Sequence, residues 1–282
     1  MSIRTDMAVE AHELSRGEAK EIDGVKLESL SHGNITRTVV DILDDNGART
    51  LKKVQGRYIT IQAPDIKNST EDYESVCKML AEDLRVMCKN SRTTLVVGLG
   101  NRDITPDALG AGVVDRLLIT THIKKYMPDV FDDNYSNVSA IIPGVMGTTG
   151  IETVEIVKGV TEKVKPDTII AVDALAGADI NRVSNSIQIA DTGIAPGSGV
   201  GNHRTGLNEE TLGVKVIAIG VPTVISAELI GGESIPEEYK SLMVTTKDID
   251  LVIKRMSKTV ANGINMALHK NLTIREIDEL VG

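Results

Sequence analysis

Two aspartates follow short apolar runs that we expect to be buried strands of a parallel sheet. Asp107 lies in "LVVGLGNRDITPDALG", in the loop after the run Leu95–Val97, and Asp173 comes directly after the apolar run of "TIIAVDALA". Open α/β sheets place their ligands at the carboxyl ends of the strands, so the two carboxylates face one crevice if these strands are neighbours. Such a pair can activate a water molecule, one carboxyl as base and the other as acid, or it can bind a metal ion.

The glycines between the first run and Asp107 do not complete a nucleotide-binding motif. A G-x-G-x-x-G motif beginning at Gly98 requires glycine where Asp103 stands, and the Gly-Lys-Ser/Thr of a P-loop is absent. A carboxylate at the start of the following helix would also repel a phosphate. One structural alternative stays open: Thr105 as the N-cap, Pro106 as the first helical residue and Asp107 as an acid stabilised by the helix dipole.

Two glycine-rich loops also follow expected strands, "PGVMGTTGIET" (143–153) and "GIAPGSGVG" (193–201). Glycine allows another backbone to approach closely, as when a peptide lies along a site. The candidate substrate-binding residues in these loops are Gly144, Gly147, Thr148, Gly197 and Gly199. A serine nucleophile is not indicated, because Ser198 lies outside a G-x-S-x-G turn and no partner histidine is identifiable. The histidines show no H-x-x-x-H spacing, and His203 alone follows a glycine loop at the expected site.

The order of the expected elements predicts an α/β fold with three layers, α/β/α, a mostly parallel sheet and a small N-terminal β region. Residues 1–34 are polar without a sustained period, which is typical of an arm. The Asn-Gly turn signal in "DDNG" predicts a hairpin between strands within 35–63. The remaining pattern predicts alternating elements: helix 71–89, strand 94–99, helix 107–126, strand 138–142, helix 151–164, strand 168–172, short strand 186–190, strand 214–219 and helix 247–269.

The composition excludes several classes of protein. The 282 residues, 41% of them hydrophobic, suffice for one large α/β domain or two small ones. A formal net charge of −9 argues against broad nucleic-acid binding, which requires a basic surface. No stretch reaches the roughly 18 consecutive apolar residues of a membrane span. The first residues, "MSIRTDMAVEAHEL", lack the apolar core of a secretory signal, so we expect none.

The two cysteines, Cys77 and Cys88, both fall in the expected helix 71–89. Eleven helical residues separate them by about 16 Å along the axis. A disulfide requires Cα atoms within about 7 Å, so we predict no bridge between them. Free thiols are typical of a reducing compartment.

Five motifs resemble those of the germination protease family, spore endopeptidases that degrade small acid-soluble spore proteins: "IRTDMAVEA", "VVGLGNRDITPDALG", "IIPGVMGTTGIET", "VDALA" and "IADTGIAPGSGVGN". The resemblance implies that Asp107 and Asp173 are the catalytic pair and that the fold is similar to that of hydrogenase-maturation peptidases. It further implies a homotetramer in the cytoplasm of the forespore or the spore core, with neither a cofactor nor a metal. Small acid-soluble spore proteins would be the substrate, with no direct binding of nucleic acid or membrane.

The resemblance also implies a zymogen. Family substrates are cut after an acidic residue that precedes an apolar residue and Ala, and "DMA" repeats that pattern near the start of this chain. We therefore predict cleavage between Asp6 and Met7, favoured in mild acid, where Arg4 would release the acid pair. The domains would be an arm, 1–34, with a prosegment of about residues 1–6, and a single peptidase domain, 35–282. One departure from the family is a short segment, 224–243, where members often carry a longer insertion.

Two rival functions remain. The same aspartates could be ligands of a metal-dependent peptidase, although no matching histidine is evident in this chain. The glycine loops could also hold a peptide or another ligand in a protein without catalytic activity.

Overall fold

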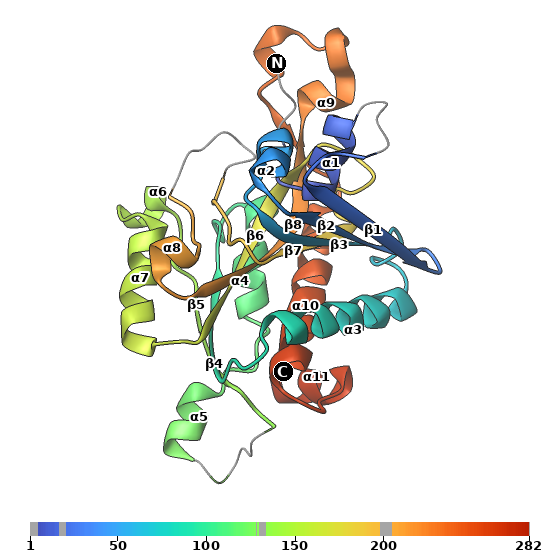
Figure 1. Cartoon of the computed structure of the whole chain (residues 1–282). Coiled ribbons are helices and arrows are strands. Elements are labelled where there is room, and N and C mark those ends of the chain that lie inside the picture. Colours follow the sequence, from blue (N-terminus) through green and yellow to red (C-terminus); the bar gives the residue numbers. More distant parts are fainter. Residues whose placement is uncertain (1–4, 17–20, 128, 130–133, 198–204, 282) are drawn as a thin grey trace.

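The computed structural model describes residues 5–16, 21–127, 129, 134–197 and 205–281. Within these ranges one sheet of nine strands forms the centre of the molecule (Figure 1), in the order β1-β2-β3-β7-β8-β6-β4-β5, with β9 paired to β8. The strands are β1 Val25–His32, β2 Ile35–Ile42, β3 Gly56–Gln62, β4 Thr93–Gly98, β5 Asn137–Ile141, β6 Thr168–Gly177, β7 Ser186–Ala190, β8 Lys215–Ser226 and β9 Met243–Val244.

The sheet is mixed, with a parallel half and an antiparallel half. The strands β8, β6, β4 and β5 are parallel to one another, as the alternation of strands and helices predicts. The predicted N-terminal β region does not stand apart, because β1, β2 and β3 extend the same sheet through antiparallel pairing with β7. Since β7 also pairs antiparallel with β8, the two halves meet between those strands.

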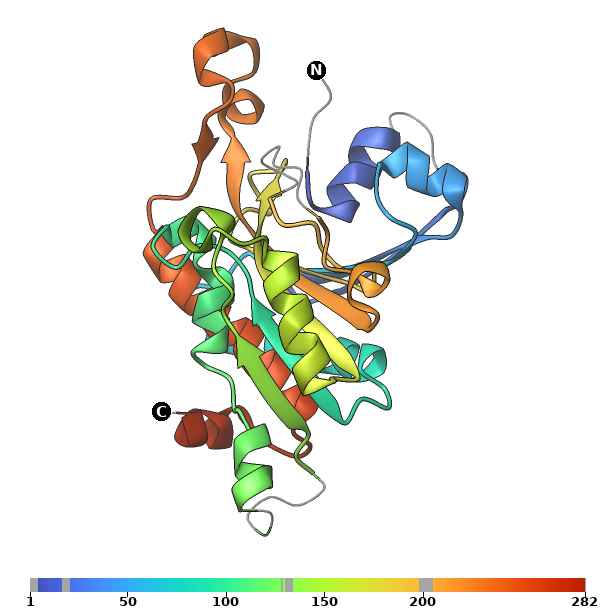
Figure 2. The same cartoon turned by 90° about the vertical axis from the view of Figure 1, so that its left-hand side faces the viewer.

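Helices cover both faces of the sheet, so the predicted α/β/α layering is confirmed (Figures 1 and 2). One face packs against α3, α4 and α10 through a large apolar core. The other face packs against α7 and α8 over the parallel half, and against α1 and α2 over the antiparallel half. The helices are α1 Ala8–Arg16, α2 Asp45–Leu51, α3 Thr70–Met87, α4 Leu109–Val114, α5 Thr121–Tyr126, α6 Met146–Thr149, α7 Thr153–Val164, α8 Glu209–Leu212, α9 Ala227–Gly231, α10 Ile249–Leu268 and α11 Ile274–Val281, with short 3-10 turns η1 Thr105–Asp107, η3 Gly232–Ser234 and η4 Glu237–Tyr239.

The segment expected to be a polar arm is instead folded where the structure describes it. Residues 8–16 form α1 and residues 25–32 form the edge strand β1. Met7 and Ala8 are completely buried against the antiparallel half of the sheet. Val9 and Ala11 are buried with them, but so are the polar side chains of Glu10 and His12, so α1 lacks the regular hydrophobic period of a surface helix.

The "DDNG" stretch forms a helix rather than the predicted hairpin. Asp44 is the N-cap of α2, and its carboxylate accepts the backbone N–H of Gly47 at 2.9 Å. An Asn-Gly hairpin turn needs positive φ at both residues, and neither Asn46 nor Gly47 has one. The capping bond therefore prevails over the turn signal, and the chain passes through α2 before β3.

The single helix predicted for residues 107–126 is divided into η1, α4 and α5. The side chain of Asn265 on α10 accepts the backbone N–H of Leu118 at 2.9 Å, in place of a helical carbonyl. The hydroxyl of Thr120 then donates to the carbonyl of Ser136 at 2.5 Å. Tertiary partners of this kind compete with helix continuation. The helix predicted for 151–164 is confirmed as α7, which begins two residues later at Thr153.

Cys77 and Cys88 are both free and buried, as predicted. Burial raises the pKa of the Cys77 thiol to about 12 and that of Cys88 to about 11, so both are protonated at neutral pH. In the described part of the chain, no helix has the length and apolar character needed to cross a membrane.

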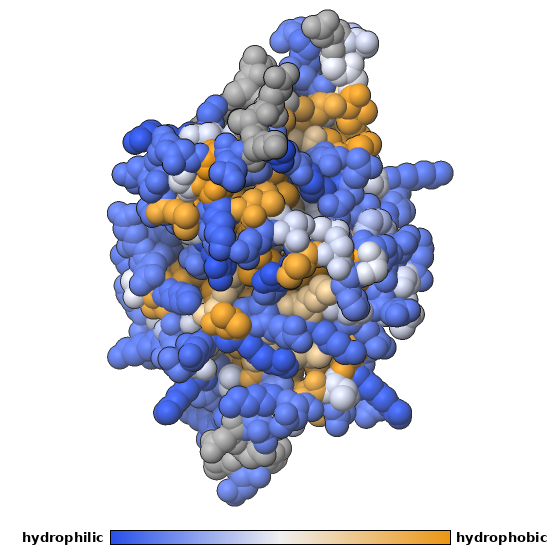
Figure 3. Space-filling model, turned by 45° about the vertical axis from the view of Figure 1, so that its right-hand side comes forward, coloured by the Kyte–Doolittle hydropathy of each residue, from blue (hydrophilic) through white to orange (hydrophobic). Residues whose placement is uncertain are grey.

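The segment from α9 to β9 projects from the sheet at the end of the molecule where α1 lies (Figures 1 and 2). It carries several exposed apolar side chains: Ile230, Tyr239, Leu242, Met243 and Val244. Figure 3 shows apolar residues beside the projecting end of the molecule and further apolar areas scattered over the same, mostly hydrophilic, face.

His269, at the end of α10, predicts an acid-sensitive stability. Its imidazole is completely buried and hydrogen bonds through Nε2 to the Leu118 carbonyl at 3.1 Å, and burial lowers its pKa to about 4. The unfolded chain therefore binds a proton below about pH 6.5, while the folded protein does not bind it until about pH 4. We expect this residue to remove about 2 to 3 kcal/mol of the free energy of unfolding between pH 7 and pH 4.5.

Urea unfolding at both pH values tests this expectation with His269→Gln, which retains an amide donor toward Leu118. The variant should lose less stability on acidification than the wild type, by about 2 to 3 kcal/mol. The exposed His122 on α5 supplies the control, since His122→Gln should follow the wild type. An equal acid loss in His269→Gln and the wild type would contradict the assignment.

Candidate functional site

Asp173 stands at the point where a neighbouring strand stops. Strands β4 and β6 are parallel neighbours, as the proposed crevice requires, and the last residue of β4, Gly98, pairs with Val172. Strand β6 does not end at Asp173 as predicted but continues to Gly177, with a register shift after Leu175. Asp173 is therefore the first residue of β6 beyond the end of β4. It is 5% exposed, and its Oδ1 accepts the backbone N–H of Ala174 at 2.9 Å.

Asp107 is held by the loop that follows β4. Its Oδ2 accepts the backbone N–H of Asn101 at 2.7 Å, so the carboxylate turns back toward the glycine loop. Gly100 has a φ of +90°, and a Cβ there would lie 2.1 Å from the Asp107 carbonyl oxygen. The predicted cap is wrong, because Thr105 lies inside η1 and the N-cap position belongs to Ile104, which makes no capping bond.

A close contact between backbones sets the position of α4 and of the acid that precedes it. A Cβ on Gly110 would lie 2.4 Å from the Leu99 backbone and 2.6 Å from the Val172 carbonyl oxygen. A Cβ on Gly98 would likewise lie 2.3 Å from the Gly110 carbonyl oxygen. Only glycine permits this approach, which places η1 and Asp107 directly over the ends of β4 and β6.

Asp107 and Asp173 line one cavity of about 400 Å³. Its size is that of a ligand pocket. Its wall comes from the ends of β4, β6 and β8 and from the loops after β5 and β7. Thr223 also lines this cavity. Its buried hydroxyl has no hydrogen-bond partner among the described residues, so it is available to hydrogen bond to the backbone of a bound peptide.

The structure places only some of the predicted substrate-binding residues in the wall of this cavity. Gly144 and Gly197 line the cavity with the two aspartates. Gly147 and Thr148 belong to the exposed helix α6 and are not among its lining residues, so their role stays a prediction. Gly199, and with it Arg4, Ser198 and His203, lies outside the described residues.

Asp6 also lines this cavity, which sequence reasoning did not foresee. Its backbone N–H donates to the Ala176 carbonyl at 3.0 Å, and its Oδ2 accepts the Ala176 N–H at 2.9 Å. On the other side the ammonium of Lys53 donates to the Thr5 carbonyl at 2.8 Å, and burial lowers the pKa of this lysine. The chain around the Asp6–Met7 bond is thus bound along β6 as a peptide ligand would be.

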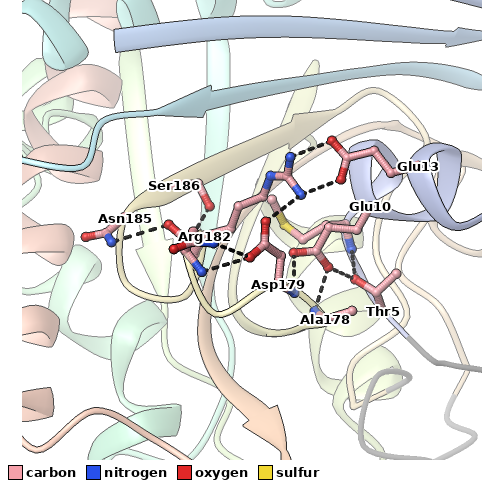
Figure 4. A network of polar contacts seen from close by, with 10 residues as sticks. Thr5, Glu10, Glu13, Ala178, Asp179, Arg182, Asn185 and Ser186 are labelled. Carbon is pink, nitrogen blue, oxygen red and sulfur yellow. Dashed lines mark hydrogen bonds and ion pairs between the residues drawn. The ribbon is translucent and has the colours of Figure 1, made fainter. Parts of the chain in front are cut away.

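Helix α1 is fixed to the loop after β6 by a network of polar contacts (Figure 4). Glu10 is 2% exposed, and its carboxylate accepts the hydroxyl of Thr5 and the N–H groups of Ala178 and Asp179. Burial raises the pKa of Glu10 above its usual value. Arg182 donates two hydrogen bonds to Glu13, at 2.7 and 2.6 Å. These bonds position the N-terminal segment against the strand that carries Asp173.

Gln188 on β7 is a second residue that sequence reasoning missed. It lines a neighbouring cavity of about 260 Å³, of which Asp6 and Leu175 are also part. The available signal was a polar amide between two isoleucines in the strand "SIQIA"; the structure leaves Gln188 7% exposed. Among the described residues, no group of three or more His, Cys, Asp and Glu side chains is arranged to hold a metal ion.

Comparison with known proteins gives consistent matches. A sequence model described as germination protease matches residues 3–240. The chain is 43% identical to the germination protease of Clostridium tetani (strain Massachusetts / E88), covering 99% of each chain. It is 37% identical to that of Bacillus subtilis (strain 168), covering 96% of this chain and 94% of the relative. These alignments run over 319 and 348 positions, so both relatives carry residues without a counterpart in this shorter chain.

Among solved structures, the [NiFe] hydrogenase maturation protease HycI from Thermococcus kodakarensis KOD1 aligns with a TM-score of 0.37 at 18% identity. The alignment covers 64% of this chain and 98% of that chain.

Proposed function

The chain belongs to the germination protease family, and from that membership we propose that it cleaves peptide bonds with a water molecule held between Asp107 and Asp173. The family makes it an endopeptidase of spore germination; the two aspartates as its catalytic groups are our proposal. The observation that supports it most directly is the shared cavity, in which both aspartates lie with a bound segment of the same chain.

The proposed reaction needs one ionised and one protonated carboxyl group. The ionised aspartate takes a proton from the water molecule while the oxygen of that water attacks the carbonyl carbon of the peptide bond. The protonated aspartate gives its proton to the amide nitrogen as the carbon–nitrogen bond of the tetrahedral intermediate breaks. The products are a carboxylic acid and an amine, and the pair has exchanged roles for the next cycle.

We propose that the first bond cut is the chain's own, between Asp6 and Met7. The contacts that support this are those of Asp6 with Ala176, because they fix the residue before the bond inside the acid-bearing cavity. Cleavage would release residues 1–6 and leave Met7, which is completely buried, as the new first residue.

Incubation of the full chain in mild acid tests this proposal. We expect intact mass and N-terminal sequencing to show Met7 as the first residue. Asp6→Ala should slow the cleavage about 10- to 100-fold, because the Ala176 N–H loses a charged acceptor worth about 1.5–3 kcal/mol. The exposed Asp45 on α2 supplies the control, since Asp45→Ala should leave the rate unchanged.

A chain that keeps Met1 or Ser2 as its first residue while cutting a spore-protein peptide would refute self-processing. The remaining parts of the proposal follow from the family. Small acid-soluble spore proteins are the proposed substrate, the forespore or spore core is the proposed location, and the proposed assembly is a homotetramer of this 30.3 kDa chain.

A further inference from the structure

Gln188 lies in one row with the proposed catalytic Asp173. Asp173 on β6 pairs with Gly220 on β8, and Gly220 pairs in turn with Gln188 on β7. Directly paired residues point to the same face of a sheet, so the two side chains flank a position without a side chain. Two strand spacings place their Cα atoms roughly 10 Å apart. The side chain of Leu175 lies over Gly220, since a Cβ there would be 2.4 Å from it, so Asp173 and Gln188 lie on either side of Leu175.

The side chain of Gln188 forms hydrogen bonds to the backbone on both sides of the Asp6–Met7 bond. Its Nε2 donates to the carbonyl of Asp6 at 3.1 Å, and its Oε1 accepts the backbone N–H of Ala8 at 2.7 Å. Only this orientation of the amide makes both bonds, because the reverse would set oxygen against oxygen and N–H against N–H. The carbonyl that receives the bond is the one that water attacks in the proposed self-cleavage.

We propose that Gln188 is a catalytic residue whose side-chain N–H stabilises the oxyanion formed on the attacked carbonyl. This inference rests on the proposed peptidase function. Asp6 borders both cavities, the one lined by the aspartates and the one lined by Gln188. The nucleophilic water and the donor therefore approach the carbonyl group from different sides. As the carbonyl oxygen gains negative charge, its hydrogen bond to the amide strengthens, which lowers the barrier.

The donor keeps its direction after the N-terminal piece leaves. Ala8, which holds Oε1, is on the retained side of the cleaved bond and is completely buried in the first turn of α1. The Nε2 group then points to the position that the Asp6 carbonyl occupied. An external peptide that follows the same course places its own carbonyl there, so the same amide serves both reactions.

The substitution Gln188→Glu tests the proposal in the full chain, with the nonapeptide IRTDMAVEA as an external substrate. An ionised carboxylate cannot donate to an oxyanion and repels it. At neutral pH we expect the rate of self-cleavage to fall about 10²- to 10³-fold, as for loss of one oxyanion donor. After self-cleavage is complete, kcat toward the peptide should be lowered by a similar factor, with KM changed less than about threefold. As the pH falls toward the ordinary pKa of glutamate, near 4.3, the protonated carboxyl regains an O–H donor and the deficit should shrink.

Gln188→Ala should show a deficit that does not change with pH. Gln62→Glu, on the adjacent strand β3 and outside both cavities, is the control for the same change and should match the wild type. A Gln188→Glu variant with unchanged kcat would overturn the proposal. So would a loss that is equal at all pH values and follows a lowered Tm, because a purely structural role predicts that result.

Different results would refute the peptidase proposal and the proposal for Gln188. A wild-type chain that cuts neither itself nor the peptide would overturn it, and the role of Gln188 with it. A wild type that cuts the peptide but not itself would refute self-processing alone, and the pH profile of Gln188→Glu would still decide the role of the amide.

Discussion

Replacing Asp107 or Asp173 by asparagine should lower the rate of peptide cleavage by about 10³-fold or more and leave the protein folded. Asparagine has the shape of aspartate but neither accepts the proton of a water molecule nor returns one to a leaving amine. The two residues line the same cavity and act on the same water in the proposed reaction, so the double variant should be little worse than either single one. Cleavage of IRTDMAVEA followed by mass spectrometry measures the loss.

Asp103→Asn is the matched control, because Asp103 lies in the same loop with its side chain exposed, outside the lining of the cavity. Its activity should equal that of the wild type. Treatment with a chelator separates the rival enzyme function, since a metal-dependent peptidase would lose activity and regain it when the metal is returned. Full activity of either Asn variant would refute the aspartate pair, and a wild type that binds the peptide without cutting it would favour a binding protein.

Gly100→Ala should disable the site through the backbone. The added Cβ would lie 2.1 Å from the Asp107 carbonyl oxygen and 2.8 Å from its Oδ1, and a φ of +90° is itself unfavourable for alanine. We expect the free energy of unfolding to fall by about 2–4 kcal/mol. Because relief of the clash must move Asp107, kcat should fall about 10²-fold, as for a displacement of about 1 Å. Urea unfolding and peptide cleavage measure the two effects.

Gly159→Ala controls for the substitution itself. Gly159 lies within α7, and nothing is within 4 Å of a Cβ added there. Alanine is the better helix former by about 1 kcal/mol, so this variant should be as stable as the wild type or slightly more stable, with full activity. Equal behaviour of the two variants would show that Gly100 does not hold Asp107 in place.

The position of the acid pair was predictable because it depends on a general rule of α/β sheets. An apolar run followed by glycine and an acid indicates a strand and its carboxyl end, and the neighbouring placement of β4 and β6 then brings Asp107 and Asp173 together. The exact end of β6 was not predictable. Its continuation past Asp173 depends on pairing with the long strand β8 and on a register shift, which are tertiary features.

Gln188 could not be assigned a role from its surroundings in the sequence. Its proposed role depends on its alignment with Asp173 across the paired strands β6, β8 and β7. It also depends on hydrogen bonds to Asp6 and Ala8, which are 182 and 180 residues away in the chain. The N-terminal segment was misread for a related reason. Glu10 is buried because backbone N–H groups about 170 residues away satisfy its carboxylate, and hydrophobic periodicity does not detect burial of that kind.

The bound course of residues 5 and 6 has a kinetic consequence. While they remain covalently attached, they compete with every external peptide at an effective concentration of the order of millimolar. If Asp107 and Asp173 are the catalytic pair, an intact chain should be silent toward dilute substrates although both aspartates already line the cavity. The intact chain would be inactive because its own N-terminal residues fill the substrate site. Each copy that loses its first six residues would then bind substrate without any rearrangement of the sheet.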